Sequence, residues 1–171
     1  MSGGEFSLLG FVGHLAALVI ETDRAEHDAL DHAARIIQDE AKASVGTYQP
    51  QSGPFAAWAP LAEATKDDRV RRGYAADEPE LRDGTLRDSI ERTVGGGRGL
   101  GLERVAEVGS NLDIMEFQEL GTPNMPPRSI LGGAAARKSD DVALVIGETY
   151  VAELGLGAGS AIAGSFIPIR R

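Results

Sequence analysis

Apolar residues recur at every third or fourth position through the N-terminal part of the chain. The positions concerned are Leu8, Phe11, Leu15, Val19, Ala25, Ala29, Ala33, Ile36 and Ile37. Because this spacing places them on one helix face, we predict a long helix over residues 6–44 that ends at Gly46. A continuous helix of that length reaches roughly 55 to 60 Å. The core of a compact domain of this size requires less, so we expect the helix to pack also on a neighbouring subunit.

The next segment is rich in proline and glycine and contains the only tryptophan of the chain. Residues 47–60 have the composition of a loop with fixed turns. A single Trp among small residues usually anchors a loop on a core, so we expect Trp58 to be buried, where its truncation costs about 3 to 5 kcal/mol. Residues 61–72 then indicate a short helix with Pro60 at its first turn and arginines near its C-terminal end.

A run of glycines separates two segments of strand character. Residues 91–94 and 102–108 contain branched residues, among them Val105 and Val108, and five of the seven residues between the two segments are glycine. We therefore predict a β-hairpin with a mobile tip. The tip, with Gly97 and Arg98, is expected to contact neighbouring subunits.

Helical spacing returns after the hairpin. Residues 111–120 indicate a short helix closed by Gly121, with Ile114, Phe117 and Leu120 facing inward. The three prolines that follow force an extended passage.

The C-terminal part divides into two segments of different composition. Residues 129–154 have helical or mixed character, whereas residues 155–171 are rich in Gly, Ala and Ser and close on Phe166 and Ile167. We interpret the last segment as an arm that becomes ordered on a partner, with those two apolar residues as interface candidates.

These segments predict an α+β protein. The long N-terminal helix and shorter helices pack on a small antiparallel sheet, and the hairpin and the C-terminal arm extend from it. The corresponding divisions are residues 1–46 for the long helix, 47–154 for the α+β core and 155–171 for the arm. A length of 171 residues suits one such domain and leaves little room for a second enzymatic one.

The charge of the chain disfavours a grip on nucleic acid. Acidic residues number 26 and basic residues 17, which gives a net charge of −9, opposite in sign to the surface that binds phosphates. An acidic surface is compatible with DNA that passes as non-specific cargo through a channel, because like charges repel at close range.

Cysteine is absent, which excludes disulfides and cysteine ligands for zinc and fits synthesis in a reducing cytoplasm. The apolar run over residues 11–20 is interrupted by Gly13 and His14 and is too short for a membrane span. It also lacks the basic region and cleavage site of a signal peptide. We therefore expect neither a membrane partner nor a signal sequence.

Two histidine and aspartate pairs stand four residues apart in the long helix. The pairs are His27 with Asp31 and Asp28 with His32, a spacing that can hold a metal ion on one helix face. A small metal-dependent enzyme that uses these four residues is therefore the alternative from a different class. Solvated charges or a helix interface explain the same pattern more simply, and this is the interpretation we adopt.

Other candidate chemistry fails at the level of the motif. The glycine run over residues 94–101 lacks the Gly-Lys-Ser/Thr ending of a phosphate loop and precedes a strand-like segment. Ser160 stands in Gly-Ala-Gly-Ser-Ala-Ile, which does not match a nucleophile elbow. We therefore predict that the protein is not an enzyme and assign no catalytic, cofactor-binding or metal-binding residue.

Three blocks of sequence, in order, carry a family resemblance. They are Trp58-Ala-Pro-Leu61 with Thr65, then Leu81-Arg-Asp-Gly-Thr-Leu-Arg-Asp-Ser-Ile90, then Val108-Gly-Ser110 with Phe117-Gln-Glu-Leu-Gly-Thr122 and Met125-Pro-Pro-Arg-Ser-Ile-Leu131. Together they resemble the virion-morphogenesis, or tail-completion, proteins of Mu-like and lambda-like phages. Similar proteins occur in prophages and gene transfer agents. The resemblance covers about half the chain and departs from the family at Leu120 and Ile130, where Phe is usual.

The resemblance implies a structural virion protein of the neck, made in the host bacterial cytoplasm and located at the head-tail junction. It implies a hexameric or other ring of copies that joins or terminates the tail, with neighbouring neck, tail-tube or portal-side proteins as partners and with no cofactor. A tail terminator and a head-side connector are alternatives of the same class. The interface candidates in the matching blocks are Trp58, Glu119, Gly121, Thr122, Pro126 and Arg128. Arg128 offers a fork of donors either to a partner or to its own loop.

Overall fold

The structure is a computed structural model that describes residues 8–96 and 104–153. Its helices are α1 (Leu8–Ser44), α2 (Glu63–Arg71), α3 (Thr85–Asp88), α4 (Asp113–Leu120), α5 (Leu131–Arg137) and α6 (Ser139–Glu153). Strands β1 (Glu91–Gly96) and β2 (Arg104–Gly109) pair antiparallel. The predicted α+β class, with a long N-terminal helix and a small antiparallel sheet, is confirmed.

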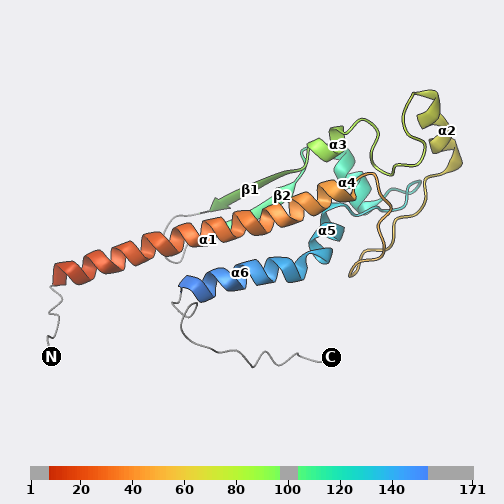
Figure 1. Ribbon diagram of the computed structural model, residues 1–171. Coiled ribbons are helices and arrows are strands. Elements are labelled where there is room, and N and C mark those ends of the chain that lie inside the picture. Colours follow the sequence, from red (N-terminus) through yellow and green to blue (C-terminus); the bar gives the residue numbers. More distant parts are fainter. Residues whose placement is uncertain (1–7, 97–103, 154–171) are drawn as a thin grey trace, which may run out of the picture.

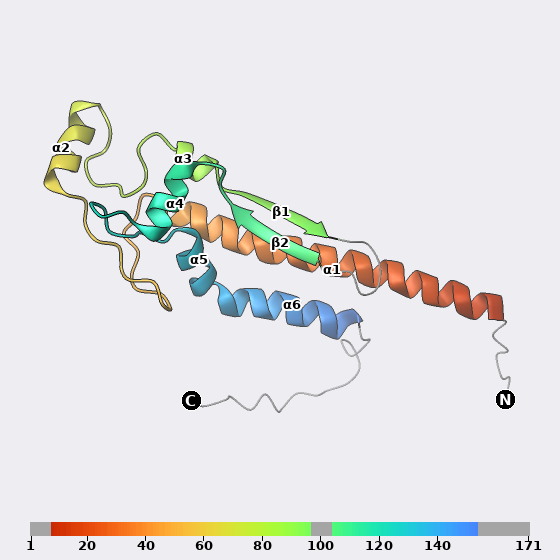
Figure 2. The ribbon, with the colours of Figure 1, turned by 180° about the vertical axis from the view of Figure 1, so that it is seen from behind.

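Helix α1 is the central layer of the molecule. The β1–β2 hairpin lies along one side of it, and α5 and α6 lie along the other (Figure 1; Figure 2 from behind). The helix is continuous over 37 residues and ends where Gly46 adopts a φ of 99°. A positive φ suits glycine, and the Gly46 N–H donates to the Pro79 carbonyl at 2.7 Å. The N-terminal part of α1 extends beyond β1, β2 and α6 (Figure 1).

The two strands form a hairpin whose register pairs Glu91 with Gly109 and Gly96 with Arg104. Alternate residues of each strand are partly buried while those between them are mostly exposed, as expected when one face of a sheet is covered. Helix α1 provides that cover.

Polar side chains connect the hairpin to α1. Arg92 Nε donates to Asp31 at 2.9 Å, and Arg92 Nη1 donates to Gln38 Oε1 at 2.7 Å. Gln38 Nε2 in turn donates to the Ile90 carbonyl at 2.8 Å. On the second strand, Arg104 pairs with two acidic residues of α1. The hydrogen bond from Arg92 is the main reason that the pKa of Asp31 is lowered from its ordinary value.

The hydrophobic core lies where the C-terminal part of α1 meets the loop and the shorter helices. Its buried members are Ala41, Val45, Trp58, Leu86, Ile90, Met115, Ile130 and Ala134. The predicted burial of Trp58 is confirmed, since it is 6% exposed. Several members are small, so the helices approach closely but bury modest apolar area per residue.

The prediction for the first short helix is wrong at its start. Helix α2 begins at Glu63, so Pro60 lies outside its first turn. Ala62 is extended, and Leu61 is buried with its N–H donating to the Tyr48 hydroxyl at 3.0 Å. Because Leu61 is buried as part of the preceding loop, the helix starts two residues later than predicted.

The predicted inward face of residues 111–120 is also wrong. Ile114, Phe117 and Leu120 are 48%, 51% and 72% exposed, whereas Met115 and Gln118 are buried. Polar contacts with distant segments fix this orientation, because the Gln118 carbonyl and the neighbouring Glu119 carboxylate both bind residues that follow the proline segment. Apolar spacing alone did not identify the buried face.

The predicted tip and arm lie outside the described residues. This applies to Gly97 and Arg98 in the hairpin connection and to Phe166 and Ile167 in the C-terminal segment. Their assignment as interface residues stays a prediction.

Gly121 provides a test of the turn that follows α4. Its φ of 75° and ψ of 176° fall in a region that is essentially limited to glycine. An added Cβ would lie 2.9 Å from both the Met125 carbonyl oxygen and the Pro127 nitrogen. We expect Gly121→Ala to lower the free energy of unfolding by about 3 kcal/mol in urea denaturation.

Gly73→Ala is the matched control, because Gly73 also has a positive φ, of 81°, but open space around it. Its cost should be limited to about 1 kcal/mol. Equal losses for the two variants would contradict the role of steric contact at Gly121.

Candidate functional site

The blocks that carry the family resemblance converge in space. Trp58 Nε1 donates to the Ser129 carbonyl at 3.3 Å, which joins the first block to the last. Ser89 and Ser110 share a hydroxyl hydrogen bond of 2.7 Å, which joins the end of the second block to the strand end. Segments far apart in the sequence therefore form one packed unit beside the C-terminal part of α1.

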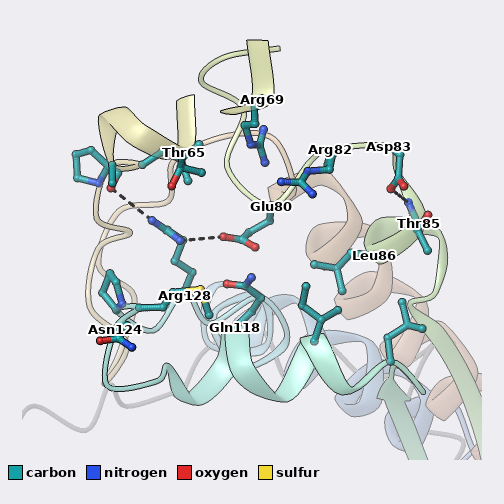
Figure 3. A pocket seen from close by; sticks show the side chains of 17 residues that line it. Thr65, Arg69, Glu80, Arg82, Asp83, Thr85, Leu86, Gln118, Asn124 and Arg128 are labelled. Atoms are coloured by element: carbon teal, nitrogen blue, oxygen red, sulfur yellow. Dashed lines mark hydrogen bonds and ion pairs between the residues drawn. The ribbon is translucent and has the colours of Figure 1, made fainter. Parts of the chain in front are cut away.

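The Arg128 side chain joins two other segments of this unit. Its Nε and Nη2 donate to the Ala59 carbonyl at 3.1 and 3.0 Å. Its Nη1 donates to Glu80 at 3.1 Å (Figure 3). The backbone N–H of Arg128 donates to the Gln118 carbonyl at 2.7 Å. The guanidinium thus joins segments of its own chain. Because the Arg128 side chain is only 6% exposed, loss of these hydrogen bonds would leave buried polar groups unpaired and lower the free energy of unfolding.

Glu80 is the buried partner of Arg128. Its side chain is 5% exposed, and its φ of 62° is unusual for a residue with a Cβ. Burial raises the pKa of Glu80, because it disfavours the charged form, and the attraction of Arg128 opposes this shift. Glu80 therefore combines backbone strain with a buried ionisable group.

Arg69 organises the segment that precedes Glu80. It is 5% exposed, and its Nη1 donates to the Glu78 carbonyl at 2.6 Å and to the Leu81 carbonyl at 2.9 Å. The sequence suggested only a favourable cation near a helix end. In the structure Arg69 fixes the irregular segment that presents Glu80 to Arg128.

Glu119 holds the start of α5. One carboxylate oxygen accepts the N–H groups of Ile130, at 2.7 Å, and of Leu131. The other accepts the Ser129 hydroxyl at 2.6 Å, and the Ser129 oxygen accepts the Gly133 N–H at 3.0 Å. The first N–H groups of a helix have no partner within it, so Glu119 serves as a capping residue supplied from α4.

A cavity of about 530 Å³ lies between α4 and the segment around Glu80. Its apolar lining comes from Leu61, Leu86, Leu112, Ile114, Met125 and Pro126. Gln118 extends from α4 towards Glu80 (Figure 3), and its Oε1 is buried with no hydrogen-bond partner among the described residues. An unpaired buried acceptor costs about 1 to 3 kcal/mol, so this oxygen is suited to a donor from a bound partner.

The interface candidates fall into three groups. Trp58, Glu119 and Arg128 are engaged inside the chain. Gly121, Thr122 and Pro126 lie in the turn after α4, where Thr122 and Pro126 are exposed and the Thr122 N–H donates to the Met125 carbonyl at 2.8 Å. Gly97, Arg98, Phe166 and Ile167 lie outside the described residues.

Sequence reasoning missed Gln118, Glu80 and the tertiary role of Arg69. Gln118 stood inside a quoted block but had no charge or periodicity to mark it. Nothing local to Glu80 indicates that its carboxylate meets an arginine 48 residues away.

The histidine and aspartate pairs of α1 do not converge on a common point. His27 and His32 are exposed, and Asp31 is engaged by Arg92 and Arg35. Among residues 8–96 and 104–153, no three His, Cys, Asp or Glu side chains are grouped so as to hold a metal ion.

Comparison with known proteins adds no relative, because no family model, no curated protein and no solved structure matches the chain. In the part of the chain that the structure describes, no helix combines the length and hydropathy of a membrane span.

Arg128 provides a direct test of the packed unit. Removal of one partner of a buried ion pair leaves the other charge uncompensated, so we expect Arg128→Met to lower the free energy of unfolding by about 3 to 5 kcal/mol. The control is Arg71→Met, since Arg71 is 74% exposed and lies 3.9 Å from Asp68. The control should cost about 0.5 kcal/mol or less in the same urea titration. A loss at Arg128 as small as that of the control would contradict its structural role.

The raised pKa of Glu80 predicts a pH dependence of stability. The folded chain holds the Glu80 proton more tightly than the unfolded chain, so this group contributes less stability as pH rises from the ordinary value of 4.5 through the raised value. Glu80→Gln removes this titration. The free energy of unfolding of Glu80→Gln, relative to that of the unsubstituted chain, should therefore increase with pH across that window and then level off.

Urea titrations at several pH values measure this difference. Asp77→Asn is the control. A hydrogen bond from Tyr48 lowers the pKa of Asp77 from its ordinary value of 3.8, so Asp77 loses its contribution to stability only as the pH falls below 3.8. A pH-independent difference for Glu80→Gln would show that Glu80 titrates normally.

Proposed function

We propose that the protein is a structural subunit of a tailed-phage particle that acts at the head-tail junction. In this proposal copies of the chain form a hexameric or other ring that joins or terminates the tail. The partners are neighbouring neck, tail-tube or portal-side proteins, and DNA passes through without specific binding.

The observation that carries the proposal is the convergence of the three sequence blocks. Trp58, Ile90 and Ile130 come from different blocks and share one buried core. Ser89 and Ser110, as well as Trp58 and Ser129, are joined by hydrogen bonds between blocks. A set of short motifs that packs as one unit supports a family resemblance better than scattered matches would.

Two surface features favour assembly with other chains. Apolar side chains on α4 and α6 are exposed, among them Leu120 at 72% and Leu144 at 61%. Among the described elements, none extends as far as the N-terminal part of α1 (Figure 1). Exposed apolar surface and a helix that extends beyond its neighbouring elements are typical of subunits that complete their packing in an assembly.

The proposal specifies the class of virion protein more closely than its position within the particle. A tail terminator and a head-side connector would use the same subunit architecture, and the net charge of −9 suits any position where DNA passes an acidic wall without sticking.

Electron microscopy of particles from a strain that lacks this gene tests the proposal. We expect full heads without tails alongside free tails, and restoration of joined particles by the gene supplied in trans. Tails of uncontrolled length would move the assignment to the terminator. Normal infectious particles would contradict the structural role altogether.

A further inference from the structure

The exposed apolar residues of α4 form a surface continuous with the cavity. We define the α4 face as Ile114, Phe117 and Leu120, which are 48%, 51% and 72% exposed. Successive helix residues are about 100° apart, so Ile114 lies between Gln118 and Phe117 around the helix. Leu120 lies further round on the same side, with Asp113, two turns earlier along the helix, between it and Phe117. Ile114 and Gln118 also line the cavity. An apolar strip therefore leads from the cavity across α4.

Acidic side chains border this strip. Asp113 and Glu116 are exposed and lie beside Leu120 around the helix. Neither takes part in an ion pair within residues 8–96 and 104–153. A partner that covers the α4 face would bring basic groups close to them.

The cavity adds a requirement for a hydrogen-bond donor. Gln118 Oε1 is buried and unpaired in the described part of the chain. The three arginines that line the cavity are already engaged: Arg128 binds Ala59 and Glu80, Arg69 binds backbone carbonyls, and Arg82 pairs with Asp68 at 3.6 Å. The matching occupant offers apolar groups and an N–H donor to the cavity and positive charge to the acidic residues of α4.

The C-terminal end of this chain has that chemistry. Residues 165–171 read Ser-Phe-Ile-Pro-Ile-Arg-Arg, which places three large apolar side chains before two guanidinium groups. By contrast, residues 1–7 contain one acidic and no basic side chain. Of these two ends, only the C-terminal one complements both the apolar strip and its acidic border.

We propose that residues 165–171 of one copy bind the α4 face and the adjacent cavity of a second copy. This inference rests on the proposed function in requiring that copies associate. Residues 154–165 separate the end of α6 from Phe166 and span up to about 40 Å when extended. That length is the upper limit of the distance from the end of α6 at which the segment can bind α4 of a neighbour.

Disulfide trapping tests the contact in the full-length protein, which has no cysteine of its own. Ile114→Cys is prepared with an affinity tag, Phe166→Cys without one, and the two are mixed under mild oxidation. We expect a covalent heterodimer on a non-reducing gel. In the matched control, Val70→Cys replaces Ile114→Cys, because Val70 is also exposed but lies on α2. The control mixture should give no heterodimer.

Either of two results would overturn the inference. Equal trapping by Ile114→Cys and Val70→Cys would indicate random collision. A double variant, Ile114→Cys with Phe166→Cys, that closes an internal disulfide while the mixture gives no heterodimer would place the segment on its own subunit. Circular dichroism of each variant verifies that the exposed substitutions leave the fold intact.

Charge reversal provides an independent measurement by sedimentation velocity. Arg170→Glu with Arg171→Glu in one protein, and Asp113→Lys with Glu116→Lys in another, should each weaken self-association. An equimolar mixture should restore it, because each segment then meets an α4 border of opposite sign. Failure of the mixture to restore association would contradict the proposed contact.

The outcomes separate this inference from the proposed function. Absence of the heterodimer together with tail defects in the gene-deletion strain would remove only this contact. Normal particles from that strain would remove the virion role, whatever the disulfide result.

Discussion

Burial of the Arg128 guanidinium is the constraint on which the arrangement around the candidate site depends. A buried charge is tolerated only when its donors are satisfied, and those donors bind Ala59 in the loop and Glu80 in the irregular segment before α3. The Arg128 backbone is tied in turn to Gln118 on α4. One residue thereby joins two segments that have little regular structure of their own to helix α4.

The orientation of α4 follows from this network. With the Gln118 carbonyl bound to Arg128 and the Glu119 carboxylate bound to the start of α5, the helix cannot also turn Phe117 and Leu120 inward. Its apolar residues consequently remain at the surface. The same contacts that stabilise the monomer thus create the apolar strip from which we infer binding between copies.

The rest of the molecule is held together by contacts of small and polar side chains. Helix α1 packs through small residues such as Ala33 and Ala41, which are 4% and 0% exposed, and contacts the hairpin through Arg92 and Gln38. Small and polar contacts bury less apolar area than a core of large side chains. A subunit built in this way gains stability from partners that cover its remaining apolar surface.

The sequence by itself determined the long helix, the hairpin and the helix ends at Gly46 and Gly121, because these depend on local periodicity and on glycines whose conformational freedom is intrinsic. It also identified Trp58 as a buried anchor. Tertiary structure alone decided which face of α4 is buried, that Arg128 pairs with Glu80, and that Gln118 has an oxygen beside a cavity with no partner among the described residues. Those outcomes depend on partners far away along the chain, and no local pattern encodes which distant charge or carbonyl will meet a given side chain.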